Sequence, residues 1–166
     1  MTRSPLAVFR RLTTGVYVIG VAHARQTNAF TAAWLTQVAF DPLLVALSVN
    51  VSHASYPLLA ASGAFVVNVL QEHQLDLARH FGTGSGREGD KLQGVRWRAG
   101  QFGAPVLSEA AAFLECRVTS SVQAGDHVVV IAEVVDGAVL AEDAIPMRYG
   151  ETGDMDGSSE LYPTAF

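Results

Sequence analysis

The chain has 166 residues, which is the size of one ordinary domain. Apolar types make up 49% of it and charged types 16%, so the composition excludes intrinsic disorder and is more apolar than a monomer of this length needs. With 11 basic and 16 acidic residues, the net charge is −5, which gives no general attraction for nucleic acid or an anionic membrane. We therefore expect one domain over residues 1–166, with part of its apolar surface buried between subunits.

The single cysteine, Cys116, excludes an internal disulfide and a thiolate metal cluster. It alternates with Leu114 and Val118 on an apolar strand face, so we interpret it as a core residue and not as a nucleophile. The start of the chain lacks the pattern of a signal peptide, and no apolar run has the length of a membrane span. These features predict a cytoplasmic protein.

The elements predicted in chain order favour a mainly β fold. A short helix begins at Ser4-Pro5 and ends at 13–15, because a hydroxyl cap followed by proline is a typical helix start. Six segments rich in Val, Ile, Leu, Phe and Thr then predict strands over 16–22, 30–39, 43–49, 64–70, 112–122 and 127–135. Two helices interrupt them, over about 55–62 and 71–81, and Gly82 is expected to end the second. Six strands in this length indicate a barrel or a sandwich.

Two segments lie outside these elements. Residues 82–94 are rich in glycine and predict a surface loop. The start of this loop is similar to a dinucleotide-binding fingerprint, but Arg87 occupies the position of the last required glycine and the segment follows a helix. Residues 150–166 form a polar tail with isolated Leu161, Tyr162 and Phe166, which is typical of an arm that packs on a neighbour.

Two clusters of possible metal ligands have simpler interpretations. His73, Asp76 and His80 share one edge of the second predicted helix, but they flank its apolar arc as solvated residues do. The segment 154–157 has its glycine at the fourth position, whereas a calcium loop needs it at the sixth. We predict no metal site.

Hydroxyl-rich strand ends form the strongest candidate binding site. Small and polar residues cluster at 28–34 and 48–55, and the second cluster leads into a helix whose N-terminus offers free N–H groups to an anion. Ser52 and Ser55 could hold a phosphate there, with a flat ring sheltered by the apolar strand ends. The alternative is that Ser55 caps the helix and Ser52 shapes the turn. Further along, spacing alone makes Asp126 a turn residue and His127 an exposed strand residue.

Eight segments, in this order, resemble the flavin reductase-like family. They are 13–18, 28–34, 40–44, 68–70, 81–82, 90–92, 114–116 and 125–127. The resemblance covers nearly the whole chain and is closest to the C-terminal flavin reductase module of the diflavin flavoproteins, including residues 149–159. It implies a six-stranded antiparallel Greek-key split β-barrel with short flanking helices, an FMN site and a homodimer. The di-iron and flavodoxin domains that precede this module are not in this sequence, which favours a free-standing reductase or electron carrier.

The resemblance also assigns residues to the flavin site. The implied cofactor-binding residues are Asn28, Ala29, Phe30, Thr31, Ala32, Ala33, Trp34, Ser48, Val49, Asn50, Ser52, Ser55, Phe81, Gly82 and Lys91. His127 matches a histidine that faces the nicotinamide side of the flavin, and is the implied catalytic residue. Many relatives have a glycine just before Thr31 and a serine near Ala33, so one phosphate or ribityl contact is expected from the backbone here.

The implied function is NAD(P)H-dependent reduction of bound FMN, with electrons passed to free flavin or an acceptor protein. FMN is favoured over FAD, because the phosphate-binding elements are compact and no fingerprint for a second nucleotide occurs. One alternative is a non-catalytic FMN-binding electron-transfer protein that a partner protein reduces. A more distant alternative is a barrel that binds haem or pyridoxal phosphate. The preferred nicotinamide nucleotide, the final acceptor and the release of flavin stay open.

Overall fold

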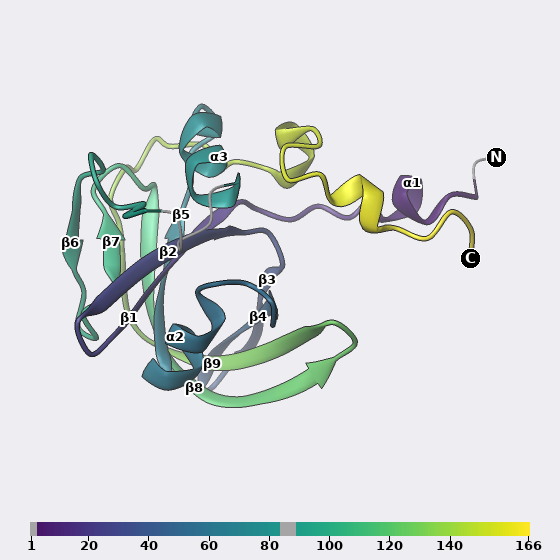
Figure 1. Ribbon diagram of the computed structural model, residues 1–166. Helices are drawn as coiled ribbons and strands as arrows, with labels where there is room; N and C mark the ends of the chain where they lie inside the picture. The colour runs from purple at the N-terminus through teal and green to yellow at the C-terminus, as the bar shows by residue number, and fades with distance from the viewer. Residues whose placement is uncertain (1–2, 84–88) are drawn as a thin grey trace.

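The computed structural model describes residues 3–83 and 89–166, and these form a mainly β protein (Figure 1). Its strands are β1 (Tyr17–His23), β2 (Gln26–Ala32), β3 (Leu35–Phe40), β4 (Leu43–Asn50), β5 (Ala64–Val69), β6 (Trp97–Ala99), β7 (Pro105–Leu107), β8 (Ala112–Ala124) and β9 (His127–Val139). Its helices are α1 (Pro5–Phe9), α2 (Tyr56–Ser62) and α3 (Leu75–Thr83), with 3₁₀ turns η1 (Tyr149–Thr152) and η2 (Ser158–Leu161). None of these described helices has the length and apolarity needed to cross a membrane.

Seven strands pair antiparallel in one sheet, in the order β2-β1-β5-β8-β9-β4-β3. The edge strands β2 and β3 are at opposite ends of this order, although only Ala33 and Trp34 separate them in the chain. A connection of that length spans roughly 11 Å at most, so the sheet curves until its two edges approach each other at these residues. The expected mainly antiparallel β class is confirmed.

The main sheet has seven strands and not the expected six, because the predicted strand over 30–39 is divided between β2 and β3. No glycine or proline marks the division, so the local pattern reads as continuous. The hairpin of β8 and β9 is longer than predicted, with 13 residues in each strand. Its turn is at Gly125, whose φ of 64° suits the first central position of a two-residue hairpin loop.

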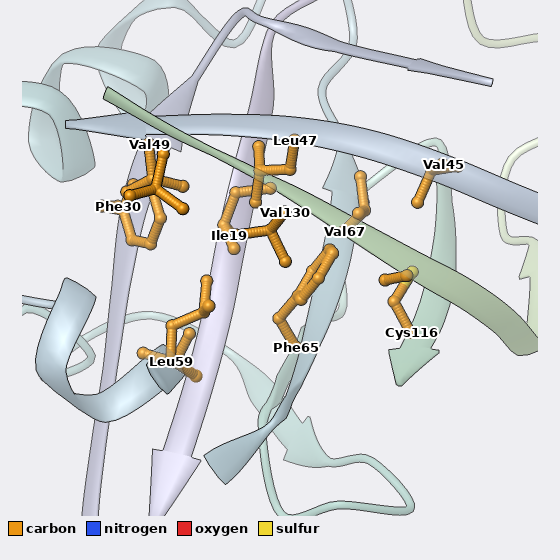
Figure 2. Packing of buried hydrophobic residues seen from close by; sticks show 13 residues of the cluster. Ile19, Phe30, Val45, Leu47, Val49, Leu59, Phe65, Val67, Cys116 and Val130 are labelled. Carbon is orange, nitrogen blue, oxygen red and sulfur yellow. The ribbon is translucent and has the colours of Figure 1, made fainter. Parts of the chain in front are cut away.

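Alternation along the strands divides the apolar side chains between two main cores. Ile19 and Phe65 are fully buried in the larger cluster, where Leu59 of α2 covers them (Figure 2). The neighbouring Val18 projects to the other sheet face and belongs to a second cluster with Phe81 of α3. Each helix therefore covers a different face of the sheet.

The helices agree with the expectation in part. The structure confirms the predicted bounds of α2. By contrast, α3 begins at Leu75, because residues 71–74 form a turn in which the Gln71 N–H donates to Gln74 Oε1 at 2.8 Å. It continues through Gly82 to Thr83, so Gly82 does not end it. The first helix ends earlier than predicted, at Phe9.

The two ends of the chain lie together and extend away from the sheet (Figure 1). The rings of Phe9 and Tyr162 are 5.7 Å apart, and an Arg10 nitrogen lies 3.8 Å from Asp154 Oδ1. We call residues 3–12 and 153–166 the terminal arm. Leu161 and Phe166, on this arm, are 82% and 77% exposed. These two side chains therefore contribute little to the core of their own chain, whereas Met155 of the tail packs against the second core.

A buried amide connects three strands near the second core. Asn68 of β5 is fully buried, and its Nδ2 donates to the carbonyls of Val18 and Pro105 at 3.0 and 3.1 Å. Its Oδ1 accepts the Leu107 N–H at 2.7 Å. These bonds attach the two-stranded sheet of β6 and β7 to the main sheet.

Candidate functional site

The segment 28–34 runs along β2 and then crosses to β3. Ala29 and Phe30 are buried in the two cores, so any contact that they make with a ligand comes from their backbone. The Thr31 hydroxyl donates to the Ala78 carbonyl of α3 at 2.7 Å. Thr31 therefore attaches α3 to β2 at the border of the predicted site.

The rest of this segment is more open. Ala32 and Ala33 are half-buried, and Trp34 is 48% exposed. Gly82 of α3 lies against Thr31, because a Cβ added to Gly82 would come within 3.4 Å of the Thr31 Cβ. This close approach brings the predicted segments around 31 and 82 together.

A polar face lies where β3, β4 and β9 meet. Ser48 and Asn50 alternate with the buried Val49, and Asn50 lies directly opposite His127 in the β4–β9 pair. The Ser48 N–H donates to the Trp34 carbonyl at 2.9 Å, and the Trp34 ring centroid is 4.9 Å from that of His127. We call Trp34, Ser48, Asn50 and His127 the Trp34–His127 face. The structure therefore brings together four of the predicted residues, while the side chain of Val49 belongs to the core.

The His127 imidazole has a defined orientation. Its Nδ1 lies 2.8 Å from Asp126 Oδ1, and an ionised carboxylate only accepts, so Nδ1 carries the proton of this bond. The bond from His127 lowers the pKa of Asp126. Nε2 of a neutral His127 is then free to accept a hydrogen bond. The ring is held between Asp126 and Trp34, with its side chain 19% exposed.

A buried cation lies at the other end of the segment. Lys91 is 7% exposed, and its Nζ donates to the Phe81 carbonyl at 3.1 Å. Burial lowers the pKa of this lysine, and burial together with the Lys91 charge lowers the pKa of His53. Among the described residues, no carboxylate lies within ion-pair distance of Lys91. A buried cation of this kind favours a bound anion.

Ser52 and Ser55 differ in their surroundings. The Ser52 N–H and hydroxyl both bond Asn50 Oδ1, at 2.9 and 2.7 Å, which is how a turn residue behaves. Ser55 stands at the start of α2, but its side chain makes no capping bond. Its fully buried Oγ has no partner among the described residues. Ser52 therefore shapes the turn, as the alternative interpretation held, while Ser55 does not cap the helix through its side chain.

Two cavities border the predicted residues. One of about 640 Å³ is lined by Asn28 and Lys91 as well as by the β1–β2 turn and α2. Another of about 450 Å³ lies between the terminal arm and Trp34. Trp34 lines the second cavity and Asn28 and Lys91 line the first, so the predicted flavin residues are divided between two cavities and are not gathered in one enclosed pocket. This donor set, with a buried cation at one end and an aromatic face at the other, fits a phosphate-bearing aromatic cofactor.

In the described residues, the possible metal ligands and Cys116 do not form a reactive site. The described residues contain no group of three His, Cys, Asp or Glu residues placed to hold a metal ion, and His80 Nε2 instead lies 2.7 Å from the Lys91 carbonyl. Cys116 is fully buried, and its burial raises the pKa of the thiol to about 12, which confirms it as a core residue. Of the fingerprint-like start of the glycine-rich segment, Gly82 and Thr83 belong to α3, and the remainder through Arg87 lies outside the described residues.

Sequence reasoning missed His53 as an individual residue. Its ring centroid lies 4.6 Å from that of Phe30, and its Nδ1 accepts the Ser55 N–H at 3.3 Å. The only signal was its place inside the hydroxyl-rich segment 48–55. Its proximity to Phe30 and Lys91 depends on the packing of three separate segments, which no local pattern contains.

Comparison with known proteins identifies the family of the chain. The model of the flavin reductase like domain family matches residues 9–156. The chain is 35% identical over 140 residues to the high molecular weight rubredoxin of Moorella thermoacetica, covering 83% of this chain and 61% of that protein. It is 30% identical over 146 residues to diflavin flavoprotein A 1 of Synechocystis sp., covering 87% of this chain and 26% of that protein. The chain thus spans about a quarter of the length of the diflavin flavoproteins that it matches.

Solved structures show the same fold. The NADH:FAD oxidoreductase SgcE6 of Streptomyces globisporus has a TM-score of 0.81 and 30% identity, with coverage of 87% of this chain and 86% of that one. An FMN-binding protein of Thermus thermophilus, solved with bound 1-cyclohex-2-enone, has a TM-score of 0.76 and 28% identity over 88% of this chain and 84% of that one. The family model covers most of the sequence, and these structures share its fold. The chain therefore belongs to the flavin reductase like domain family.

Proposed function

We propose that the protein is a flavin-binding oxidoreductase in which NAD(P)H reduces bound FMN and the electrons pass to free flavin or an acceptor protein. The observation that carries this proposal is the Trp34–His127 face, which offers a flat aromatic surface beside an oriented imidazole. The similar NADH:FAD oxidoreductase has also been solved with NAD and FAD fragments, at 31% identity. We further propose that the curved sheet corresponds to the split barrel of this family.

The chain's own residues have binding and orienting roles in this proposal. The flavin, when bound, supplies the hydride-accepting chemistry. Residues 48–55 surround the ribityl chain and the phosphate. Lys91 contacts the phosphate from the other side, because an anion offsets the cost of burying its ammonium group. The backbone of 31–34 borders the ring system. His127 positions the nicotinamide beside the flavin, with Asp126 maintaining its tautomer. No general base is needed.

The purified protein is expected to be yellow, with an absorbance band at about 450 nm, and to bleach when mixed anaerobically with NADH or NADPH. His127→Ala is expected to slow bleaching by about 10- to 100-fold while the flavin stays bound, since misplacement of a reactant by about 1 Å has effects of that size. Stopped-flow absorbance measures the rate, and mass analysis of the released cofactor distinguishes FMN from FAD. His73→Ala, an exposed histidine on the turn before α3, is the matched control.

The outcomes separate the alternatives. A flavin that neither nucleotide reduces would favour a non-catalytic electron-transfer protein that a partner protein reduces. This alternative is supported by the diflavin flavoprotein and the rubredoxin, which are longer than this chain. Their additional segments would take the place of such a partner protein. A colourless protein that takes up neither flavin, or one with a haem or pyridoxal phosphate spectrum, would overturn the assignment of the site.

We also propose a homodimer with the flavin beside the subunit interface, in which residues 150–166 form an arm on the partner. Leu161 and Phe166 are largely exposed on the terminal arm, and a two-fold contact would bury them. A reducing, cytoplasmic compartment suits the single buried cysteine.

Deletion of residues 159–166 is expected to weaken both dimerisation and flavin retention. Light scattering at micromolar concentration measures the first effect, and flavin fluorescence after gel filtration measures the second. Ile145→Ser is the control, because it removes an apolar side chain that is 54% exposed outside the arm. A flavin-loaded monomer in the unaltered protein would contradict the shared site.

A further inference from the structure

A concave pocket with two cationic residues in its lining is formed by the β1–β2 turn, α2 and residues 89–91. Its volume is about 640 Å³, within the range of roughly 300–1,000 Å³ typical of small-molecule sites. Its lining includes Arg25, Asn28 and Lys91. We call it the Arg25 pocket.

The charge in this pocket is opposite to that of the whole chain. The protein has a net charge of −5, yet among the described residues that line the pocket Arg25 and Lys91 face one carboxylate, Asp90. Asp90 Oδ1 already accepts the Leu92 N–H at 2.9 Å. Arg25 makes no ion pair among the described residues. The pocket therefore suits an anionic ligand.

The two cations occupy different depths. Lys91 is 7% exposed and attached to the Phe81 carbonyl, so its position is determined by the core. Arg25 is exposed on the two-residue turn between His23 and Gln26, which pair across the β1–β2 hairpin. A guanidinium binds phosphate through two parallel N–H bonds, which an ammonium group cannot do. The pocket thus offers one buried and one peripheral position for phosphate.

We propose that Arg25 binds a second nucleotide phosphate beyond the one at Lys91, namely a phosphate of the adenine nucleotide part of a dinucleotide. The proposal rests on the proposed function for the phosphate at Lys91. Two ligands present the required chemistry: FAD, through the phosphate that FMN lacks, and NADPH, through the phosphate that NADH lacks. In either case Arg25 is a specificity-determining residue and not a general flavin ligand.

Arg25→Gln tests this directly, because it removes the charge and retains most of the side-chain length. Dissociation constants for FMN and FAD are measured by flavin fluorescence, and Michaelis constants for NADH and NADPH by steady-state kinetics. We expect the FMN dissociation constant to change less than about 2-fold. Either the FAD dissociation constant or the NADPH Michaelis constant is expected to rise by about 10-fold or more, since loss of a hydrogen bond to a charged group weakens binding by about that factor. The ligand affected identifies the source of the phosphate. Arg98→Gln is the control, because that guanidinium lies over the Phe113 ring, outside this pocket.

A probe that needs no flavin separates this inference from the proposed function. Calorimetric titration with adenosine 2′,5′-bisphosphate, which carries both the 5′-phosphate of the FAD adenosine and the 2′-phosphate of NADPH, is expected to show binding to the unaltered protein and at least about 10-fold weaker binding to Arg25→Gln. If the protein binds no flavin but binds this probe through Arg25, the proposed function fails and the inference stands. If flavin binds, but Arg25→Gln changes neither ligand ratio nor binding of the probe, the inference is wrong. Equal weakening of FMN and FAD would also overturn it.

Discussion

Asn68→Asp is expected to lower the free energy of unfolding by about 3–5 kcal/mol at pH 7, because it places an unpaired charge where a buried amide satisfies two carbonyls. The Asn68 Nδ2 donates to Val18 and Pro105, and the aspartate oxygen in its place would face both carbonyl oxygens. The Leu107 N–H keeps its acceptor. The change is nearly isosteric, so the loss measures hydrogen bonding and charge and not packing.

The pH dependence of this variant gives a second test. Burial raises the pKa of the introduced carboxyl above its unfolded value, so the folded state binds the proton more tightly. The variant is therefore expected to regain stability as the pH falls and to lose it as the pH rises. Urea unfolding at several pH values measures both effects. Asn28→Asp is the control, since Asn28 Oδ1 only accepts the Ala29 N–H at a half-buried position. Similar losses in the two variants would contradict the interpretation.

Ser52→Ala combined with Ser55→Ala is expected to weaken flavin binding by about 2–4 kcal/mol if both hydroxyls hold the phosphate. The structure separates their effects on the ligand-free protein. Ser52→Ala removes one hydroxyl bond to Asn50 and is expected to cost about 0.5–1.5 kcal/mol of stability. Ser55→Ala removes a buried hydroxyl with no described partner, so stability is expected to stay unchanged or to rise.

The single variants decide which hydroxyl acts. Ser52 is exposed, whereas the Ser55 hydroxyl is enclosed and reaches a ligand only if the turn at 52–55 shifts. Fluorescence titration with FMN and thermal unfolding of each variant provide the two readouts, and Ser121→Ala on β8 controls for the loss of an exposed hydroxyl. A double variant with unchanged flavin affinity and a lower melting temperature would show that these serines serve only the turn.

Some structural features were readable from local patterns. Segments rich in Val, Ile, Leu, Phe and Thr located β1, β4, β5, β8 and β9, although they merged β2 and β3 into one strand. Ser55 to Gly63 marked α2 correctly, because a helix start and its closing glycine are decided within a few residues. The turn at Gly125 was equally local. The motif segments also followed one another in the order of the flavin reductase family, which the family model confirms over residues 9–156.

Other features arose only from contacts between distant segments. The division of the strand at Ala33 and Trp34 follows from curvature of the whole sheet, and local composition contains no trace of it. Lys91 reads as an ordinary loop lysine until the Phe81 carbonyl and the core bury it. The sequence alone therefore determined the β class and the family. Tertiary structure decided which side chains face each other. Burial, ring contact and ion pairing depend on distances between residues that are far apart in the chain, and a local sequence pattern does not specify those distances.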